Sequence, residues 1–236
     1  MNYTELFSTI QTYTENQFPS VFLADGSTVS ATTQIDTIIK QAEQRIYNTV
    51  QFPSIRKNVT GITSANNRYL ACPNDFLAVY SLAVIDATGN YEYLLNKDVN
   101  FIRQAYPNPT STAIPKYYAL FGPTTTNDPS PVITDELTFI LGPTPNAAYS
   151  VELHYYYYPE SITVAADGRT WLGDNFDTVL LYGSLVEAYT FMKGETDLLA
   201  VYDGKYKEAL ALAKRLGDGM ERQDAYRSGQ YRQPVT

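Results

Sequence analysis

The stretch Ser150–Pro159, which reads SVELHYYYYP, carries the strongest strand signal of the chain and its longest run of one residue type. Side chains alternate across a β-strand, so the stretch predicts one apolar face and one mixed face. The apolar face consists of Val151, Leu153, Tyr155 and Tyr157, and the mixed face of Glu152, His154, Tyr156 and Tyr158. We interpret the first face as core and the rings of Tyr156 and Tyr158 as a protein-interaction surface. The alternative is that a loop or helix of the same chain covers these two rings.

The strand lies in a longer region, 56–172, for which we predict a β-rich domain. Short segments rich in aromatic and β-branched residues are separated there by Gly, Pro or Asn, a pattern typical of strands and turns. The predicted strands are 58–63, 68–71, 79–86, 91–95, 116–121, 136–141 and 149–158. The segment 87–90 (ATGN) predicts a hairpin turn, and 99–105 predicts one or two helical turns. This pattern favours antiparallel sheets in a β-sandwich or a partly open barrel.

Helices are predicted on both sides of the β-rich domain. In residues 1–55, helical spacing of apolar residues predicts helices over 4–16 and 33–50, with a loop between them, and Pro53 ends the second helix. In residues 173–220, a helix capped by Asp174 or Asn175 ends at Gly194, and a second helix begins near Glu195. The fold class is therefore α+β, with a helical bundle formed by the N- and C-terminal helices and the central β-rich domain between them.

The remaining residues, 221–236, form a predicted extended arm with no apolar period. The segment from Lys205 onward carries seven basic and four acidic residues, so it is net +3 and leaves −11 for the rest of a chain whose total is −8. The arm interleaves arginine and tyrosine, residue types enriched in interface hot spots. Its aromatic and basic residues are Arg222, Tyr226, Arg227, Tyr231 and Arg232. Docking on a protein, binding of nucleic acid and a terminus without a role are the three interpretations.

Composition argues against catalysis and against metal or cofactor binding. His154 is the only histidine and Cys72 the only cysteine of 236 residues, too few for a zinc site. The sequence contains no phosphate-binding or dinucleotide motif, so we expect no cofactor and no enzymatic activity. Since 25 acidic residues outnumber 17 basic ones, we do not expect a nucleic-acid clamp. The chain shows no secretion signal and no membrane span, which predicts a soluble protein of a reducing compartment.

Five segments carry a resemblance to a known family. They are 41–47 (QAEQRIY), 72–76 (CPNDF), 153–159 (LHYYYYP), 171–174 (WLGD) and 185–189 (LVEAY). With the order of elements, these segments make the chain similar to the head-to-tail adaptors of short-tailed, podovirus-like bacteriophages, the tail-tubular-A type. The likeness covers nearly the whole chain.

The resemblance implies a structural virion protein of the neck or tail, assembled in the host cytoplasm. Such adaptors form a ring, usually of twelve subunits, beneath the portal protein. The ring helps retain or conduct double-stranded DNA without sequence-specific binding and is the platform for the tail nozzle or tail tube. The resemblance also implies that the C-terminal arm docks on the portal, which we transfer to Arg222, Tyr226, Arg227, Tyr231 and Arg232 as a hypothesis.

Two alternatives from other classes stay open. The first is a carbohydrate-binding β-sandwich of a phage tail or receptor-binding protein, in which Tyr156, Tyr158 and Trp171 stack on sugar rings. In the adaptor, the same three aromatic residues are expected at protein interfaces. The second alternative is an enzyme that uses a generic pair of carboxylates.

Overall fold

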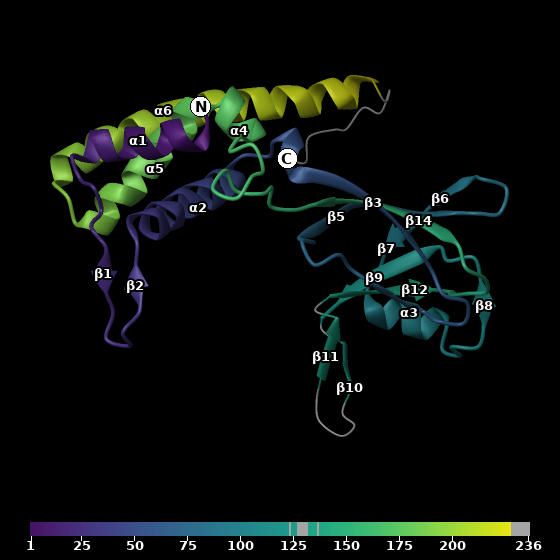
Figure 1. Cartoon of the computed structure of the whole chain (residues 1–236). Coiled ribbons are helices and arrows are strands. Elements are labelled where there is room, and N and C mark those ends of the chain that lie inside the picture. Colours follow the sequence, from purple (N-terminus) through teal and green to yellow (C-terminus); the bar gives the residue numbers. More distant parts are fainter. Residues whose placement is uncertain (123, 127–131, 136, 228–236) are drawn as a thin grey trace. The chain divides into compact units, whose positions relative to one another are not determined.

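The computed structural model describes residues 1–122, 124–126, 132–135 and 137–227, and their side chains outside 124–126, 132–135 and 217–227. The chain divides into two compact units. The helical unit comprises Met1–Ile55 and the chain from Tyr158 onward, and the sandwich unit comprises Arg56–Tyr157. The α+β class predicted from the sequence is thus confirmed (Figure 1).

Five α-helices and one 3-10 turn build the helical unit. They are α1 (Tyr3–Thr14), α2 (Ala31–Thr49), η1 (Pro53–Ile55), α4 (Trp171–Asn175), α5 (Asp177–Met192) and α6 (Thr196–Arg227). Side-chain caps define the N-termini of α1 and α2. Asn2 and Glu5 form a capping box at α1, and Ser30 accepts a hydrogen bond from the Thr33 amide at α2. Lys193, in the left-handed conformation, ends α5 and lets the chain return as α6.

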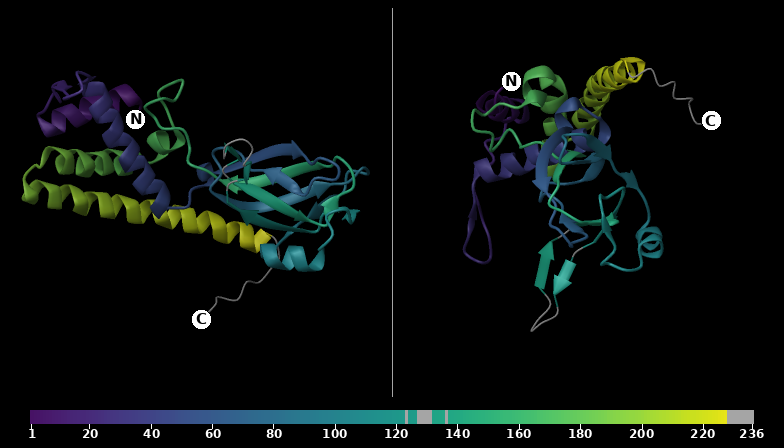
Figure 2. Two further views of the ribbon diagram at one scale, coloured as in Figure 1. Left: turned by 90° about the horizontal axis from the view of Figure 1, so that it is seen from below. Right: turned by 90° about the vertical axis from the view of Figure 1, so that its right-hand side faces the viewer.

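Helix α5 is the centre of the helical unit, because α1, α2 and α6 all pack against it (Figure 2). The packed residues are mostly aliphatic: Leu6, Ile10, Ile35, Ile38, Ile39, Ala42, Ile46, Leu180, Leu185, Ala188 and Ala213. Gly183 permits a close approach of α6, since a Cβ there would stand 3.2 Å from the ring of Tyr206. An ion pair of 2.8 Å between Arg45 and Glu187 joins α2 to α5. The predicted bundle therefore uses both ends of the chain.

Two four-stranded sheets form the sandwich unit. The first has the order β3 (Arg56–Ile62), β14 (Ser150–Tyr156), β5 (Ala78–Ile85), β6 (Tyr91–Tyr93), all antiparallel. The second has the order β4 (Tyr69–Ala71), β12 (Thr138–Gly142), β9 (Tyr117–Phe121), β7 (Leu95–Asn96), with β7 and β9 parallel. Of the two architectures predicted, the described strands form the sandwich and close no barrel.

An aromatic core joins the two sheets. It contains Phe76, Leu82, Val84, Leu94, Tyr118, Phe139, Leu141, Val151, Leu153 and Tyr155. Phe139 of the second sheet meets the edge of Phe76, which in turn stacks on Tyr155 of the first sheet. Helix α3 (Val99–Ala105) covers the other face of the second sheet through Ile102. Helix α3 is the only helix described within the sandwich unit, so the first sheet has no such helix on its outer face in this unit.

The described residues also form three smaller strand pairs. They are the antiparallel hairpins β1 (Val21–Phe22) with β2 (Thr28–Val29) and β10 (Thr124–Thr126) with β11 (Val132–Asp135), and the parallel pair β8 (Thr112–Ala113) with β13 (Thr144–Pro145). The sequence predicted a plain loop where the β1–β2 hairpin stands. That prediction missed the pairing of Val21 with Val29, because two-residue strands carry almost no periodic signal.

Three boundaries in the structure differ from those predicted from the sequence. Strand β14 ends at Tyr156 and not at Tyr158, because its partner β3 begins at Arg56 and offers no further pairing. The chain from Tyr158 to Trp171 lies in the helical unit, where the Ile162 amide donates to Glu43, and not in the β-rich domain. Helix α6 continues to Arg227, so residues 221–227 are helical and not extended. Met, Glu, Arg, Gln and Ala follow Gly219, and their helix propensity outweighs two glycines.

Candidate protein-interaction surfaces

The two faces of β14 differ as the sequence predicts. Val151, Leu153 and Tyr155 are buried in the sandwich core, and Tyr157 packs partly against it. Glu152, His154 and Tyr156 lie on the outer face and are each half-buried. Register places Arg56 and Asn58 of β3, and Ser81 of β5, beside them. The outer face of the first sheet is therefore a continuous surface built from three strands.

A cluster of cation and aromatic rings occupies one end of this outer face. The Arg56 guanidinium lies 4.9 Å from the ring centre of Tyr80 and 5.7 Å from that of Tyr156. The rings of Tyr80 and Tyr156 meet edge to face at 6.0 Å. A register shift between His154 and Tyr155 is the local irregularity of the ladder beside this cluster. Arginine held between two tyrosines is a rigid group of the kind that interfaces favour.

The other end of the outer face has a polar centre beside two further tyrosines. Asn58 donates to Glu152 at 2.7 Å, and Glu152 lies close enough to Tyr91 to raise the pKa of its hydroxyl. The rings of Tyr91 and Tyr93 stack at 6.5 Å, and both are more than half exposed. We call the outer surface formed by Arg56, Tyr80, Tyr91, Tyr93 and Tyr156 the tyrosine face. Its large, exposed rings suit a protein partner.

Tyr158 and Trp171 lie in the helical unit, whereas Tyr156 lies in the sandwich unit. The Tyr158 hydroxyl donates to the Asn48 side chain, and its ring stays partly exposed. The half-buried Trp171 packs against Phe52 and Phe176, with ring centres 5.2 and 5.6 Å away. These contacts give both residues a packing role, and an interface role for them stays a prediction.

The predicted portal-docking residues fall at the end of the described chain. Arg222, Tyr226 and Arg227 lie in the last turns of α6. Tyr231 and Arg232 lie outside the described residues. Their joint role in docking also stays a prediction.

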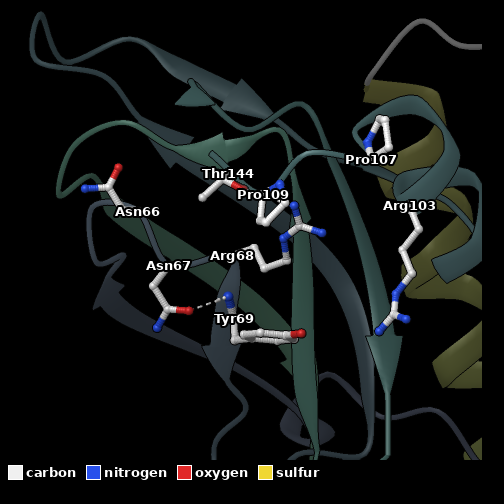
Figure 3. Close-up of a pocket in the computed structure, with 8 residues that line it drawn as sticks. All are labelled: Asn66, Asn67, Arg68, Tyr69, Arg103, Pro107, Pro109 and Thr144. Carbon is white, nitrogen blue, oxygen red and sulfur yellow. Dashed lines mark hydrogen bonds between the residues drawn. The ribbon is translucent and has the colours of Figure 1, made fainter. Parts of the chain in front are cut away.

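A pocket of about 490 Å³ in the sandwich unit has no counterpart in the sequence analysis. Arg68 lines it from the start of β4 and Arg103 from α3, with Tyr69 beside them (Figure 3). The Arg68 Nη2 lies 3.5 Å from the Thr144 hydroxyl, and the Asn67 side chain accepts from the Tyr69 amide at 3.0 Å. None of the described residues that line the pocket is acidic, so their charge favours an anionic group such as a carboxylate or phosphate. Thirty-five positions separate the two arginines, which is why no sequence motif connects them.

Within the described residues, no three His, Cys, Asp or Glu side chains gather as metal ligands. In the same residues, no helix has the length and apolar character to cross a membrane.

A comparison with protein-family models gives a match over nearly the whole chain. The model of the SU10 adaptor protein family matches residues 1–234. A comparison with curated proteins finds no match.

Proposed function

Because the chain belongs to the SU10 adaptor protein family, structural proteins of the phage head–tail junction, we propose that it forms a ring beneath the portal. The ring, with twelve copies as the expected number, helps retain and conduct the packaged DNA and carries the tail nozzle or tail tube. Assembly takes place in the host cytoplasm. The observation that carries this proposal is the family match over residues 1–234.

The tyrosine face supports the proposal, because an adaptor needs exposed surfaces for partners on more than one side. Its rings are large and rigid, so they bury area on docking at a small cost in side-chain entropy. The net charge of −8 agrees with a channel that passes DNA without gripping it, since each cationic contact to phosphate strengthens binding.

The decisive experiment is the mass of the purified full chain in solution, alone and mixed with the portal ring of the same virion. We expect a complex that carries about twelve copies. A chain that stays monomeric and ignores the portal contradicts the proposal and directs attention to sugar binding by Tyr156, Tyr158 and Trp171.

The C-terminal arm is the proposed portal contact. A chain that ends at Glu221 lacks Arg222, Tyr226, Arg227, Tyr231 and Arg232, and we expect it to fold but not to bind the portal. The core contacts of α6 lie at Tyr206, Ala209 and Ala213, well before the truncation. Full portal binding by the shortened chain would contradict a role for the arm.

A further inference from the structure

The β1–β2 hairpin exposes apolar side chains to an unusual degree. Phe22 is 80% exposed, more than any other large hydrophobic side chain in the described part of the chain, and Val21 and Leu23 are also exposed. Register puts Val21 and Val29 on one side of the hairpin and Phe22 on the other. The hairpin thus exposes apolar side chains on both of its faces, which is typical of a surface that binds another protein.

The hairpin is nevertheless preformed. At its tip, the Gly26 amide donates to the Leu23 carbonyl at 3.0 Å, and Gly26 takes the positive φ of 83° that this turn requires. The Asp25 carboxylate accepts from the amide and the hydroxyl of Ser27 at 2.9 and 2.7 Å. A locked tip lowers the entropic cost of docking.

The base of the hairpin is held by one buried side chain of α2. The Gln34 amide group donates to the Pro19 carbonyl at 3.1 Å and lies 3.4 Å from the Val29 carbonyl, so it contacts both sides of the base. An isolated two-stranded hairpin is marginally stable in water. A hairpin that is fixed at tip and base, and whose side chains Val21, Phe22 and Leu23 are exposed between them, is suited to receive a partner surface.

The same unit carries a second apolar surface on α6. Helix α6 packs on α5, where the ring of Tyr206 lies against Gly183, and a separate row of apolar side chains remains exposed along it. We call this row the α6 stripe; it consists of Leu198, Val201, Leu212 and Leu216. Hairpin and stripe are both exposed in the single chain, so they do not cover each other within one copy.

Charge complements the two surfaces. Asp25 is the only charged residue between Gln17 and Thr33, and it lies at the hairpin tip. Three exposed charged residues lie in or beside the α6 stripe, Lys205, Glu208 and Arg215, and together they carry a net charge of +1. An acidic tip between apolar side chains therefore fits an apolar stripe whose net charge is positive and which has Lys205 within it.

We propose that the β1–β2 hairpin of one copy docks on the α6 stripe of a second copy. The two surfaces differ, so every copy offers one of each, and the contact repeats from subunit to subunit until a ring closes. This inference rests on the proposed function, because it names the surfaces through which the adaptor ring forms.

Disulfide cross-linking in the assembled protein tests the contact. In a Cys72→Ser background, Phe22→Cys is combined in one chain with a cysteine at Leu198, Val201, Leu212 or Leu216 in turn. Oxidation should then give a ladder of dimers, trimers and larger species for at least one stripe position. Lys214→Cys is the matched control, because Lys214 is exposed but lies about 200° around the helix from Leu212. Equal cross-linking at Lys214, or dimers from Phe22→Cys alone and no ladder, would overturn the proposal.

Variants that place a charge on either surface distinguish the hairpin contact from the proposal that the chain forms a ring. Phe22→Asp and Leu212→Asp should each lose the ring while keeping the circular dichroism and melting temperature of the parent, since both side chains are exposed. Rings formed by both variants would overturn the hairpin contact and leave the ring proposal intact. A parent chain that forms no ring, even with the portal, would overturn both.

Discussion

The helical unit and the sandwich unit are stabilised by different side chains. In the helical unit, isoleucine and leucine from helices at both ends of the chain pack around α5. In the sandwich unit, aromatic rings bridge the two sheets, as Phe139, Phe76 and Tyr155 do. The buried residues of the helical unit recur with the helical period along each helix. The aromatic rings of the sandwich core come from strands and loops without such a period. The two units should therefore differ in how they respond to core truncation and to pH.

Truncation of the aromatic core is the largest effect that we expect. Phe139 is fully buried, so Phe139→Ala should lower the free energy of unfolding of the sandwich unit by about 3–5 kcal/mol. Urea denaturation followed by tyrosine fluorescence measures the loss. Leu95→Ala is the control on the same sheet, and its exposed side chain predicts a change within about 0.5 kcal/mol. Equal losses for the two variants would show that the inter-sheet rings are not the core.

Removal of Asp75, the hydrogen-bond partner of the Tyr155 hydroxyl, should give the next largest loss of stability. Asp75 accepts from the Tyr155 hydroxyl and pairs with Lys57, each at 2.8 Å. Burial raises the pKa of Asp75, but these two partners outweigh it and hold the pKa below its ordinary value. Asp75→Ala should cost roughly 1 kcal/mol at pH 7.

Acid should remove the same stabilisation in the parent chain. A depressed pKa means that the contribution of Asp75 is complete above its unfolded pKa, near 3.9, and is lost as the pH falls through the folded value. Denaturation of parent and Asp75→Ala at a series of pH values measures this, and the two curves should converge below pH 4. A constant difference down to pH 2 would contradict the assignment.

The tyrosine face should contribute little to stability. Tyr156 is half-buried and contacts the ring of Tyr80 and the guanidinium of Arg56, so Tyr156→Ala should cost about 0.5–1 kcal/mol. Thermal denaturation of the variant checks the value. A loss of 3 kcal/mol or more would mark the ring as core and would remove it from the candidate interface.

The helical unit should show the opposite response to pH, with the smallest effect. Glu43 is buried and accepts a hydrogen bond from the Ile162 amide, and burial raises the pKa of its carboxyl above the ordinary value. The folded state then holds this proton more tightly than the unfolded state, so stability falls as the pH rises from the unfolded pKa, near 4.3, through the folded value.

Glu43→Gln tests this response. It keeps an oxygen for the Ile162 amide and should flatten the slope, with a gain of about 1 kcal/mol or less at pH 7. Denaturation followed by helical circular dichroism between pH 4 and 7 is the measurement. The exposed Glu208→Gln is the control, and an unchanged slope in Glu43→Gln would refute the explanation.

The difference between the units also explains what the sequence predicts well. The apolar period of α2, from Ile35 to Ile46, identifies its buried face, and alternation does the same for β14. Both signals are local, because the side chains that share a face recur at a fixed spacing. The class and the order of helices and strands follow from such signals.

Features that depend on contacts between residues far apart in the chain could not be predicted from the sequence. Arg68 and Arg103 line one pocket only because α3 covers the second sheet, and nothing near either arginine indicates the other. The β1–β2 hairpin had one visible signal, Asp25-Gly26 after an apolar triplet, but its strands are too short to alternate. Trp171 was predicted at an interface, and its contact with Phe52 joins segments more than 100 residues apart.

The pairing of Arg56 with Tyr156 has a consequence for how the two units are connected along the chain. The sandwich unit begins and ends on neighbouring strands, which stand about 4.8 Å apart in a sheet. Its entry and exit are therefore close enough for a few residues of linker to join Ile55 directly to Tyr158. Such an arrangement lets a whole module be exchanged, lengthened or excised through two adjacent cuts, while the helices that flank it keep their own contacts.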